Sequence, residues 1–177
     1  AFICQMIALT RETGNLGIMT SFVWMFISSF ERLRRKIVDS HTLVSLVQLH
    51  YDAFADAKAH VCTFIVRKKY LQKHKSSFVR LSDFPGVENQ EPKTLEAIRN
   101  HECGWFFETD QDDFAMIPGR PIAYGAGARV RSLFASMPKL ADLGEPRRGL
   151  QPGNTPKHVR YWHEVDISNT AFSVDPE

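Results

Sequence analysis

Leu16-Gly17-Ile18-Met19-Thr20-Ser21-Phe22-Val23-Trp24-Met25-Phe26-Ile27 is the apolar stretch that decides the predicted fold. It is shorter than the roughly 20 apolar residues that cross a bilayer, and it is long enough for a buried strand and a turn. We therefore predict a central strand over residues 16–27.

A crossover helix follows this strand. Ser28-x-x-Glu31 has the form of a capping box, in which the serine hydroxyl and the glutamate carboxylate bond to free amides of the first helical turn. Phe30, Leu33 and Ile37 then recur at helical spacing. These signals predict a helix that starts at about residue 28.

Two further strands are predicted after the helix. The apolar, β-rich runs 43–49 and 61–66 are separated by a loop over residues 50–59, and the second run stops at three basic residues. The order is strand, helix, strand, loop, strand, which indicates an α/β fold. Any α/β domain could contain such a unit, and fold alone names no activity.

The composition limits the class of protein, its partners and the state of its cysteines. At 177 residues, with 44% hydrophobic and 11% aromatic residues, the chain can bury a sizeable core. A net charge of +2 is only a weak argument for a polyanionic partner, so local basic clusters must provide that argument. Cys4, Cys62 and Cys103 are few and odd in number, which favours reduced thiols in a cytoplasmic protein.

The N-terminal residues predict a helix. Its apolar face is formed by Phe2, Ile3, Met6, Ile7 and Leu9, with a plausible glycine terminator afterwards. A signal peptide needs a basic leader and a small-residue cleavage site, and the sequence shows neither. We expect an internal fragment of a longer protein and no membrane association.

The middle of the chain carries weaker signals. Residues 70–92 are polar and basic and then rich in turn formers, so they are interpreted as a connection with little core of its own. A short helix with proline in its first turn is predicted over 92–100, and a strand over 104–109. His101-Glu102-Cys103 is compared with a zinc deaminase, but no second cysteine pair follows, so no metal site is predicted.

The residue identities in the N-terminal part of the chain add information to the order of its elements. Gly14-Asn15-Leu16-Gly17-Ile18-Met19-Thr20-Ser21-Phe22-Val23-Trp24-Met25, followed by the segments 28–34, 53–54 and 63–68, resembles the second half of the catalytic domain of adenine-specific DNA methyltransferases. The nearest likeness is to the PglX type of BREX phage-defence systems, which implies a role in phage defence or restriction-modification. The resemblance implies a class I methyltransferase sheet that is closed by an antiparallel pair of strands.

The resemblance continues in the segment 110–124. Its core, Phe114-x-x-Ile117-Pro-Gly-x-Pro-Ile-Ala-Tyr124, is similar to the passage from catalytic domain to target-recognition region in PglX-like enzymes. Gly125-Ala126-Gly127 stands where the family has a tryptophan and a helix-capping serine, so the sequence does not define the start of the next helix. That helix still has an apolar face of Val130, Leu133 and Phe134.

The segment 145–154 is similar to the opening of the family's recognition domains, which are α+β. Adjacent arginines beside glycines suit a turn that brings guanidinium groups to a phosphate, although a plain surface loop looks much the same. The residues predicted to contact DNA are Arg147, Arg148, Gly149, Asn154, Lys157 and Arg160. An apolar and aromatic strand is predicted over 159–165.

The chemistry that the resemblance implies is methyl transfer from S-adenosylmethionine to the N6 amine of adenine. The sequence contains no Phe-x-Gly-x-Gly loop and no Asn-Pro-Pro-Tyr tetrapeptide, so no catalytic or cofactor-binding residue is assigned. His60 and Thr63 correspond to a weakly defined motif near the target base. We expect these 177 residues alone to bind the cofactor poorly and to transfer no methyl group.

The sequence thus predicts three parts, which are the second half of a methyltransferase catalytic domain (1–69), a connecting segment (70–121) and the start of a target-recognition domain (122–177). The expected partners are double-stranded DNA and other defence-system proteins. The alternative is a non-enzymatic DNA-binding or protein-interaction module, which the missing signature motifs and the basic loop at 147–148 favour.

Overall fold

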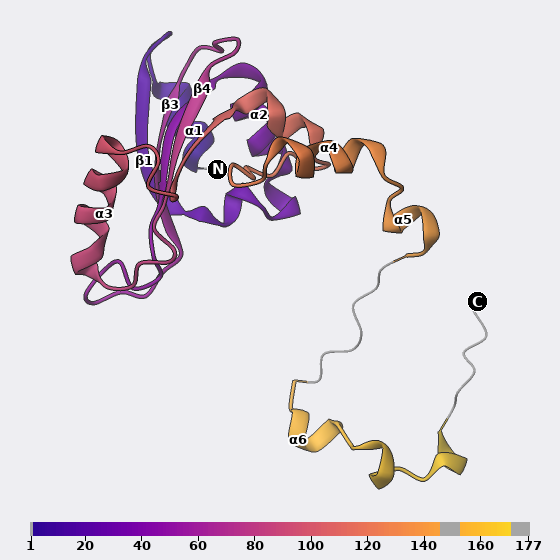
Figure 1. The fold of residues 1–177 in the computed structure, drawn as a ribbon. Coiled ribbons are helices and arrows are strands. Elements are labelled where there is room, and N and C mark those ends of the chain that lie inside the picture. The colour runs from indigo at the N-terminus through magenta and orange to yellow at the C-terminus, as the bar shows by residue number, and fades with distance from the viewer. Residues whose placement is uncertain (1, 146–152, 171–177) are drawn as a thin grey trace. The chain divides into compact units, whose positions relative to one another are not determined.

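The computed structural model describes residues 2–145 and 153–170 (Figure 1). The chain divides into two compact units, residues 1–137 and 138–177, which are described separately.

The first unit is built on one five-stranded sheet in the order β1-β3-β2-β4-β5. Its strands, in chain order, are β1 (Asn15–Ser21), β2 (Thr42–Gln48), β3 (Val61–Arg67), β4 (Lys75–Arg80) and β5 (Phe106–Asp110). The strand β3 is antiparallel to both β1 and β2, whereas β2 and β4 are parallel. The carboxyl ends of β1, β2 and β4 therefore lie at the same edge of the sheet.

This topology confirms the predicted α/β unit. The strands predicted over 16–27 and 43–66 share one sheet, and β3 lies between β1 and β2 as the last strand of the unit. β5 pairs antiparallel with β4 and completes the other edge.

The first strand is shorter than predicted. β1 ends at Ser21, and Phe22–Met25 forms a 3-10 turn, η1, in which Trp24 and Met25 are buried. The partner strand β3 begins at Val61, opposite Ser21, so β3 has no residue that could pair with the chain beyond Ser21. The apolar run therefore continues as a turn that fills the core rather than as a strand.

The crossover helix α2 (Glu31–Ser40) forms without the predicted capping box. A 3-10 turn, η2 (Ser28–Phe30), precedes it, and no side chain caps its N-terminus. Glu31 instead pairs with Arg35 one turn later, at 2.8 Å between Oε1 and Nη2. The carboxylate thus takes a guanidinium partner on the same helix rather than a backbone amide.

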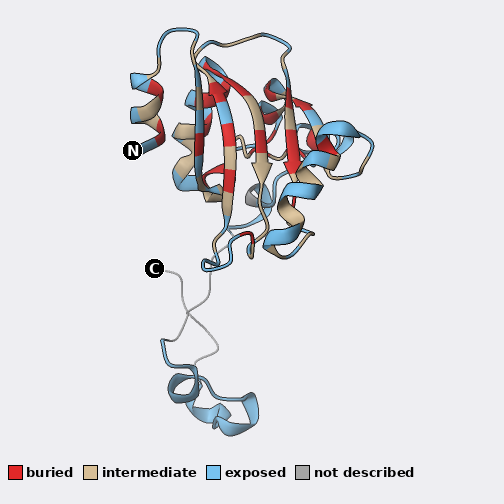
Figure 2. Cartoon of the chain, turned by 90° about the vertical axis from the view of Figure 1, so that its left-hand side faces the viewer, coloured by how far each residue is buried: buried red, intermediate tan, exposed pale blue. Residues whose placement is uncertain are grey.

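Apolar side chains pack on both faces of the sheet. α1 (Phe2–Leu9) and α2 lie on one face and α3 (Val87–Arg99) on the other (Figure 1). The larger cluster, between the sheet and α1 and α2, includes Ile7, Ile37, Leu46, Phe64 and Phe78. A smaller cluster on the α3 face is formed around Val79, Leu81 and Ala97. Figure 2 shows the buried residues running along the strands.

The interpretation of residues 70–92 as a connection with little core is wrong. This stretch contains β4, which pairs with β2 on one side and β5 on the other. Phe78 and Leu81 are fully buried, and Val79 is 5% exposed. Six residues are too short for a clear periodic signal, and Lys75 and Arg80 at the two ends gave the stretch a surface character.

Helix α3 begins earlier than predicted. It starts at Val87, after Gly86 at φ 88°, and Pro92 lies inside the helix rather than in its first turn. The Thr94 hydroxyl donates to the carbonyl of Gln90 at 2.6 Å. The proline removes one amide donor, and the helix continues past it. The strand predicted over 104–109 corresponds to β5.

The segment 110–124, which resembles the family's passage to the recognition region, is part of the same core. The large apolar residues of the family-like core in this segment are buried, namely Phe114, Ile117, Ile122 and Tyr124. Gln111 is 1% exposed, and its amide donates to the carbonyls of Val38 and His41 while its oxygen accepts from Leu43 N. The motif is thus explained by packing against the end of α2 and the start of β2.

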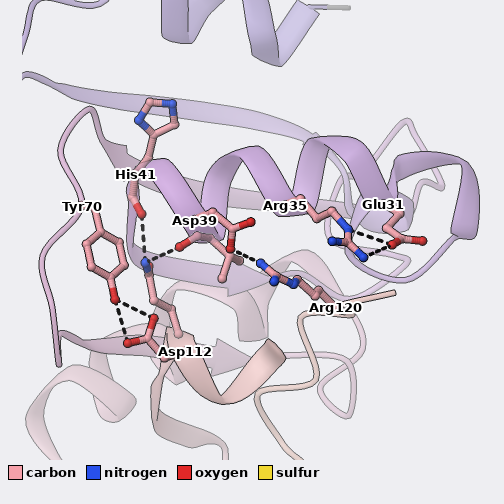
Figure 3. Close-up of polar contacts among 9 residues, drawn as sticks. Glu31, Arg35, Asp39, His41, Tyr70, Asp112 and Arg120 are labelled. Atoms are coloured by element: carbon pink, nitrogen blue, oxygen red, sulfur yellow. Dashed lines mark hydrogen bonds and ion pairs between the residues drawn. The ribbon is translucent and has the colours of Figure 1, made fainter. Parts of the chain in front are cut away.

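Further polar contacts hold this segment to the sheet unit. Figure 3 shows the Tyr70 hydroxyl directed at the Asp112 carboxylate, to which it donates at 2.7 and 2.8 Å, and Arg120 paired with Asp39. Arg131 of α4 (Ala128–Ser136) pairs with Asp113 at 2.8 Å. The helix predicted after Gly127 is present, and its apolar side chains are about half exposed.

The second unit holds only short helical turns in its described residues. They are α5 (Leu140–Leu143), α6 (Thr155–His158), η4 (Trp162–Glu164) and η5 (Ile167–Asn169). The strand predicted over 159–165 is not formed. No strand among the described residues pairs with this segment, and residues 159–165 are exposed (Figure 2). The division into parts at 69/70 and 121/122 stays a prediction.

Candidate nucleic-acid interface

Aromatic rings gather at the edge of the sheet where β1 and β2 end. We call Phe22, Phe26, Tyr51 and His60 the strand-end cluster. The ring centroid of His60 lies 5.1 Å from that of Phe22 and 4.9 Å from that of Tyr51, and Phe22 meets Phe26 edge-to-face at 6.5 Å. Phe26 and Tyr51 are 47% and 43% exposed. Such exposed faces offer stacking surfaces to a planar ligand.

Short local turns position these rings. The amide of Phe22 donates to the carbonyl of His60 at 3.1 Å, which joins the end of β1 to the residue before β3. His50 Nδ1 accepts from the amide of Asp52 at 3.0 Å, and the Ala59 amide donates to Tyr51 O at 3.1 Å. The loop between β2 and β3 is therefore closed on itself and presents Tyr51 beside His60.

The structure separates the two residues predicted to lie near the target base. His60 belongs to the strand-end cluster, whereas Thr63 lies inside β3, paired with Met19 and Val47. The neighbours of Thr63 in the strand, Cys62 and Phe64, are buried, so the Thr63 side chain lies on the opposite face. No described hydrogen bond joins Thr63 to His60. The assignment of either residue to a target base stays a prediction.

Cys62 is not available as a nucleophile. Its side chain is fully buried, and burial raises its pKa to about 11, so the thiol keeps its proton at neutral pH.

A small pocket lies next to the cluster at the same edge. It has a volume of about 160 Å³, and its polar lining comes from Gln48 at the end of β2, Arg80 at the end of β4 and Tyr124. Phe26 of the strand-end cluster also lines it. The Tyr124 hydroxyl donates to Gln48 Oε1 at 2.6 Å, and burial raises the pKa of Tyr124, so the phenol stays a donor.

The predicted DNA-contacting residues fall in two groups. Arg147, Arg148 and Gly149 lie outside the described residues. Of the others, Asn154 caps α6, since its Oδ1 accepts from the amide of Lys157 at 3.1 Å. Arg160 donates to two backbone carbonyls at 3.0 Å, and the side chains of Asn154, Lys157 and Arg160 are all exposed.

Two curated proteins match nearly the whole chain. It is 32% identical over 168 residues to the adenine-specific methyltransferase PglX of Lacticaseibacillus casei (strain Zhang), covering 93% of this chain. It is 30% identical over 172 residues to the adenine-specific methyltransferase BrxX of Escherichia coli O9:H4 (strain HS), covering 95%. The chain is related to a segment of PglX-type methyltransferases. It spans 14% of the length of each of these proteins.

Solved structures with a similar fold include two from type I restriction-modification systems. A methyltransferase subunit from Streptococcus thermophilus is 13% identical, with a TM-score of 0.48 over 63% of this chain and 26% of that one. A chain of another type I system is 14% identical, with a TM-score of 0.47 over 75% of this chain and 32% of that one. No protein-family model matches the chain.

The relationship to PglX-type proteins confirms the resemblance drawn from residues 14–25 and from the Phe-x-x-Ile-Pro-Gly core at 114–119. The mixed sheet with helices on both faces confirms the predicted α/β fold class. In the described part of the chain no helix is long and apolar enough to cross a membrane, and no three His, Cys, Asp or Glu residues gather as a metal site.

The strand-end pocket does not fit S-adenosylmethionine. Sites for ligands of that size are usually about 300–1,000 Å³, which exceeds the 160 Å³ available here. The guanidinium of Arg80 would also repel the positively charged sulfonium of the cofactor.

The sequence analysis singled out His60 and did not single out its neighbours Phe22, Phe26 and Tyr51. Their aromatic side chains were the available signal, because Phe22 follows directly on β1 and Tyr51 lies shortly after β2. It also missed Gln48 and Arg80, which are far apart in sequence and meet only through the pairing of β2 with β4.

Proposed function

We propose that this chain is part of a DNA adenine-N6 methyltransferase, and that it supplies the second half of the catalytic sheet and the passage to the recognition region. The observation that supports this most strongly is the relationship to two adenine-specific methyltransferases over more than nine-tenths of the chain. We also propose that the full-length protein acts on double-stranded DNA and binds other proteins of a defence system.

Within this function, the strand-end cluster contacts the target adenine. An enzyme that modifies a base amine must take the base out of the stack, and an extruded base is held between aromatic faces. His60 and Tyr51 form such a surface at the edge where parallel strands end, which is where ligands bind in open α/β sheets. S-adenosylmethionine, the methyl donor, is held by residues outside these 177.

Removing the cluster's rings should weaken binding to target DNA. In the full-length protein, changing both Tyr51 and His60 to alanine should reduce affinity for a duplex with the target adenine by roughly 5- to 150-fold, since base stacking is worth about 1–3 kcal/mol. The measurement is fluorescence titration with 2-aminopurine at the methylated position, after that position has been mapped.

The matched control is His74→Ala, because His74 lies before β4, at the opposite edge of the sheet. It should leave both the affinity and the fluorescence change intact. If the double variant gave the full 2-aminopurine signal at wild-type affinity, the cluster would have no role at the base. Wild-type protein that methylated no adenine would overturn the enzyme itself and favour the non-enzymatic module.

The paired arginines should contact the DNA backbone. Their sequence, two adjacent arginines beside a glycine, suits contact with phosphates better than reading of base edges. Changing Arg147 and Arg148 to alanine should weaken binding to all sequences alike and make the salt dependence shallower by about one to two phosphate equivalents. Binding isotherms over a series of salt concentrations measure this.

Arg35→Ala is a suitable control, because Arg35 is already paired with Glu31 on α2. Loss of target discrimination with normal binding to random DNA would show that Arg147 and Arg148 read bases. No change in either property would leave them in a plain surface loop.

A further inference from the structure

The pocket beside the strand-end cluster has hydrogen-bond donors that the protein itself does not use. Gln48 and Arg80 are partners in the register of the parallel strands β2 and β4, so their side chains lie on the same face. Because Tyr124 donates to Gln48 Oε1, the carboxamide nitrogen of Gln48 is left as a donor, and it makes no hydrogen bond to the described residues.

The Arg80 guanidinium lies over the Phe107 ring, 5.2 Å from its centroid, and this contact leaves the N–H donors free for hydrogen bonds. Its Nη2 lies 3.4 Å from Asp83 Oδ2, with the two side chains 39% and 65% exposed, and its Nε is buried without an acceptor among the described residues. An exposed ion pair of this length contributes little. A guanidinium has five N–H donors. The one on Nε is buried, so the donors open to a ligand are those on the two terminal nitrogens of Arg80, one of which contacts Asp83.

Gly125 lines the pocket beside the guanidinium. At Gly125 an added Cβ would already be 3.7 Å from Arg80 Nη1 and 4.0 Å from the Phe107 ring. Any longer side chain there would fill the pocket. Its 160 Å³ suits one compact acidic group, and Phe26 forms an apolar wall towards the strand-end cluster.

The geometry points to a phosphate-binding site in this pocket, formed by Arg80 and Gln48 and taking one phosphodiester of the DNA strand that carries the target base. This inference depends on the proposed function, because it places the phosphate next to the rings that would hold the base. Arg80 supplies charge-assisted hydrogen bonds, which suit the geometry of phosphate oxygens, and Gln48 adds one neutral donor. Asp83, at 3.4 Å, is displaced by the phosphate.

The test is the salt dependence of DNA binding by the full-length protein. Arg80→Gln should make the slope of log affinity against log salt concentration shallower by about 0.9, the value expected for one phosphate, and should weaken binding to all sequences alike. Gly125→Leu fills the pocket and keeps the charge, and it should reduce affinity in the same way. Thermal unfolding checks that both variants fold.

Arg99→Gln is the matched control, since Arg99 is exposed in the last turn of α3. Its slope should equal that of the wild type. An unchanged slope in folded Arg80→Gln protein, or a loss confined to the target sequence, would overturn the phosphate site and leave the proposed function standing. Failure of the wild-type protein to bind DNA would overturn both.

Discussion

Replacing Phe78 with alanine should lower the free energy of unfolding of this chain by about 3–5 kcal/mol, the range found when a fully buried phenylalanine is truncated. Phe78 is 0% exposed in the middle of β4. Its ring stacks on Tyr124 at 4.6 Å between centroids and meets Phe114 edge-to-face at 6.0 Å. Truncation removes both contacts and leaves a cavity under the segment 110–124.

Urea denaturation followed by tryptophan fluorescence measures this loss. Phe134→Ala is the matched control, because Phe134 is 48% exposed and its truncation should cost less than about 1 kcal/mol. A loss of under about 1 kcal/mol at Phe78 would restore the interpretation of residues 70–92 as a connection outside the core.

Arg34→Met should destabilise the chain by a similar amount, about 3–5 kcal/mol, because it removes a buried charged donor and leaves its acceptors unpaired. Arg34 is 1% exposed. Its Nη1 donates to the carbonyls of Trp24 and Ile27 at 2.8 and 2.7 Å, and its Nε donates to Gly119 O at 2.9 Å. Methionine keeps the apolar stem and removes all three hydrogen bonds.

The same substitution at the next residue provides the control. Arg35 is about half exposed, and its one ion pair within the described residues is with Glu31, so Arg35→Met should cost less than about 1 kcal/mol. Arg34→Lys should restore part of the stability, because an ammonium can reach one carbonyl but cannot span three. Equal losses at Arg34 and Arg35 in urea denaturation would contradict the buried role.

Hydrogen bonds from Arg34 also hold the strand-end cluster in position. The carbonyls of Trp24 and Ile27 flank Phe26, and Gly119 belongs to the turn that precedes Tyr124. The amide of Ile122 donates to Met25 O at 2.9 Å across the same junction. One buried guanidinium therefore joins the turn after β1 to the segment that resembles the passage to the recognition region.

The sequence by itself determined the elements whose signals are local. The runs 43–49 and 61–66 are continuous and apolar, and the helix residues 33 and 37 recur at helical spacing, so α2, β2 and β3 could be placed within a few residues. The wording of residues 14–25 and 110–124 also identified the relationship to PglX-type methyltransferases.

Only the tertiary structure decided where residues 70–92 belong, where the first strand ends and which side chains form the interface. β4 is a strand because β2 and β5 pair with it, and β1 stops at Ser21 because β3 begins opposite. Gln48 and Arg80 meet because the parallel register of β2 and β4 pairs them. Hydrogen bonding between distant strands sets these features, and a local pattern of residues does not contain that pairing.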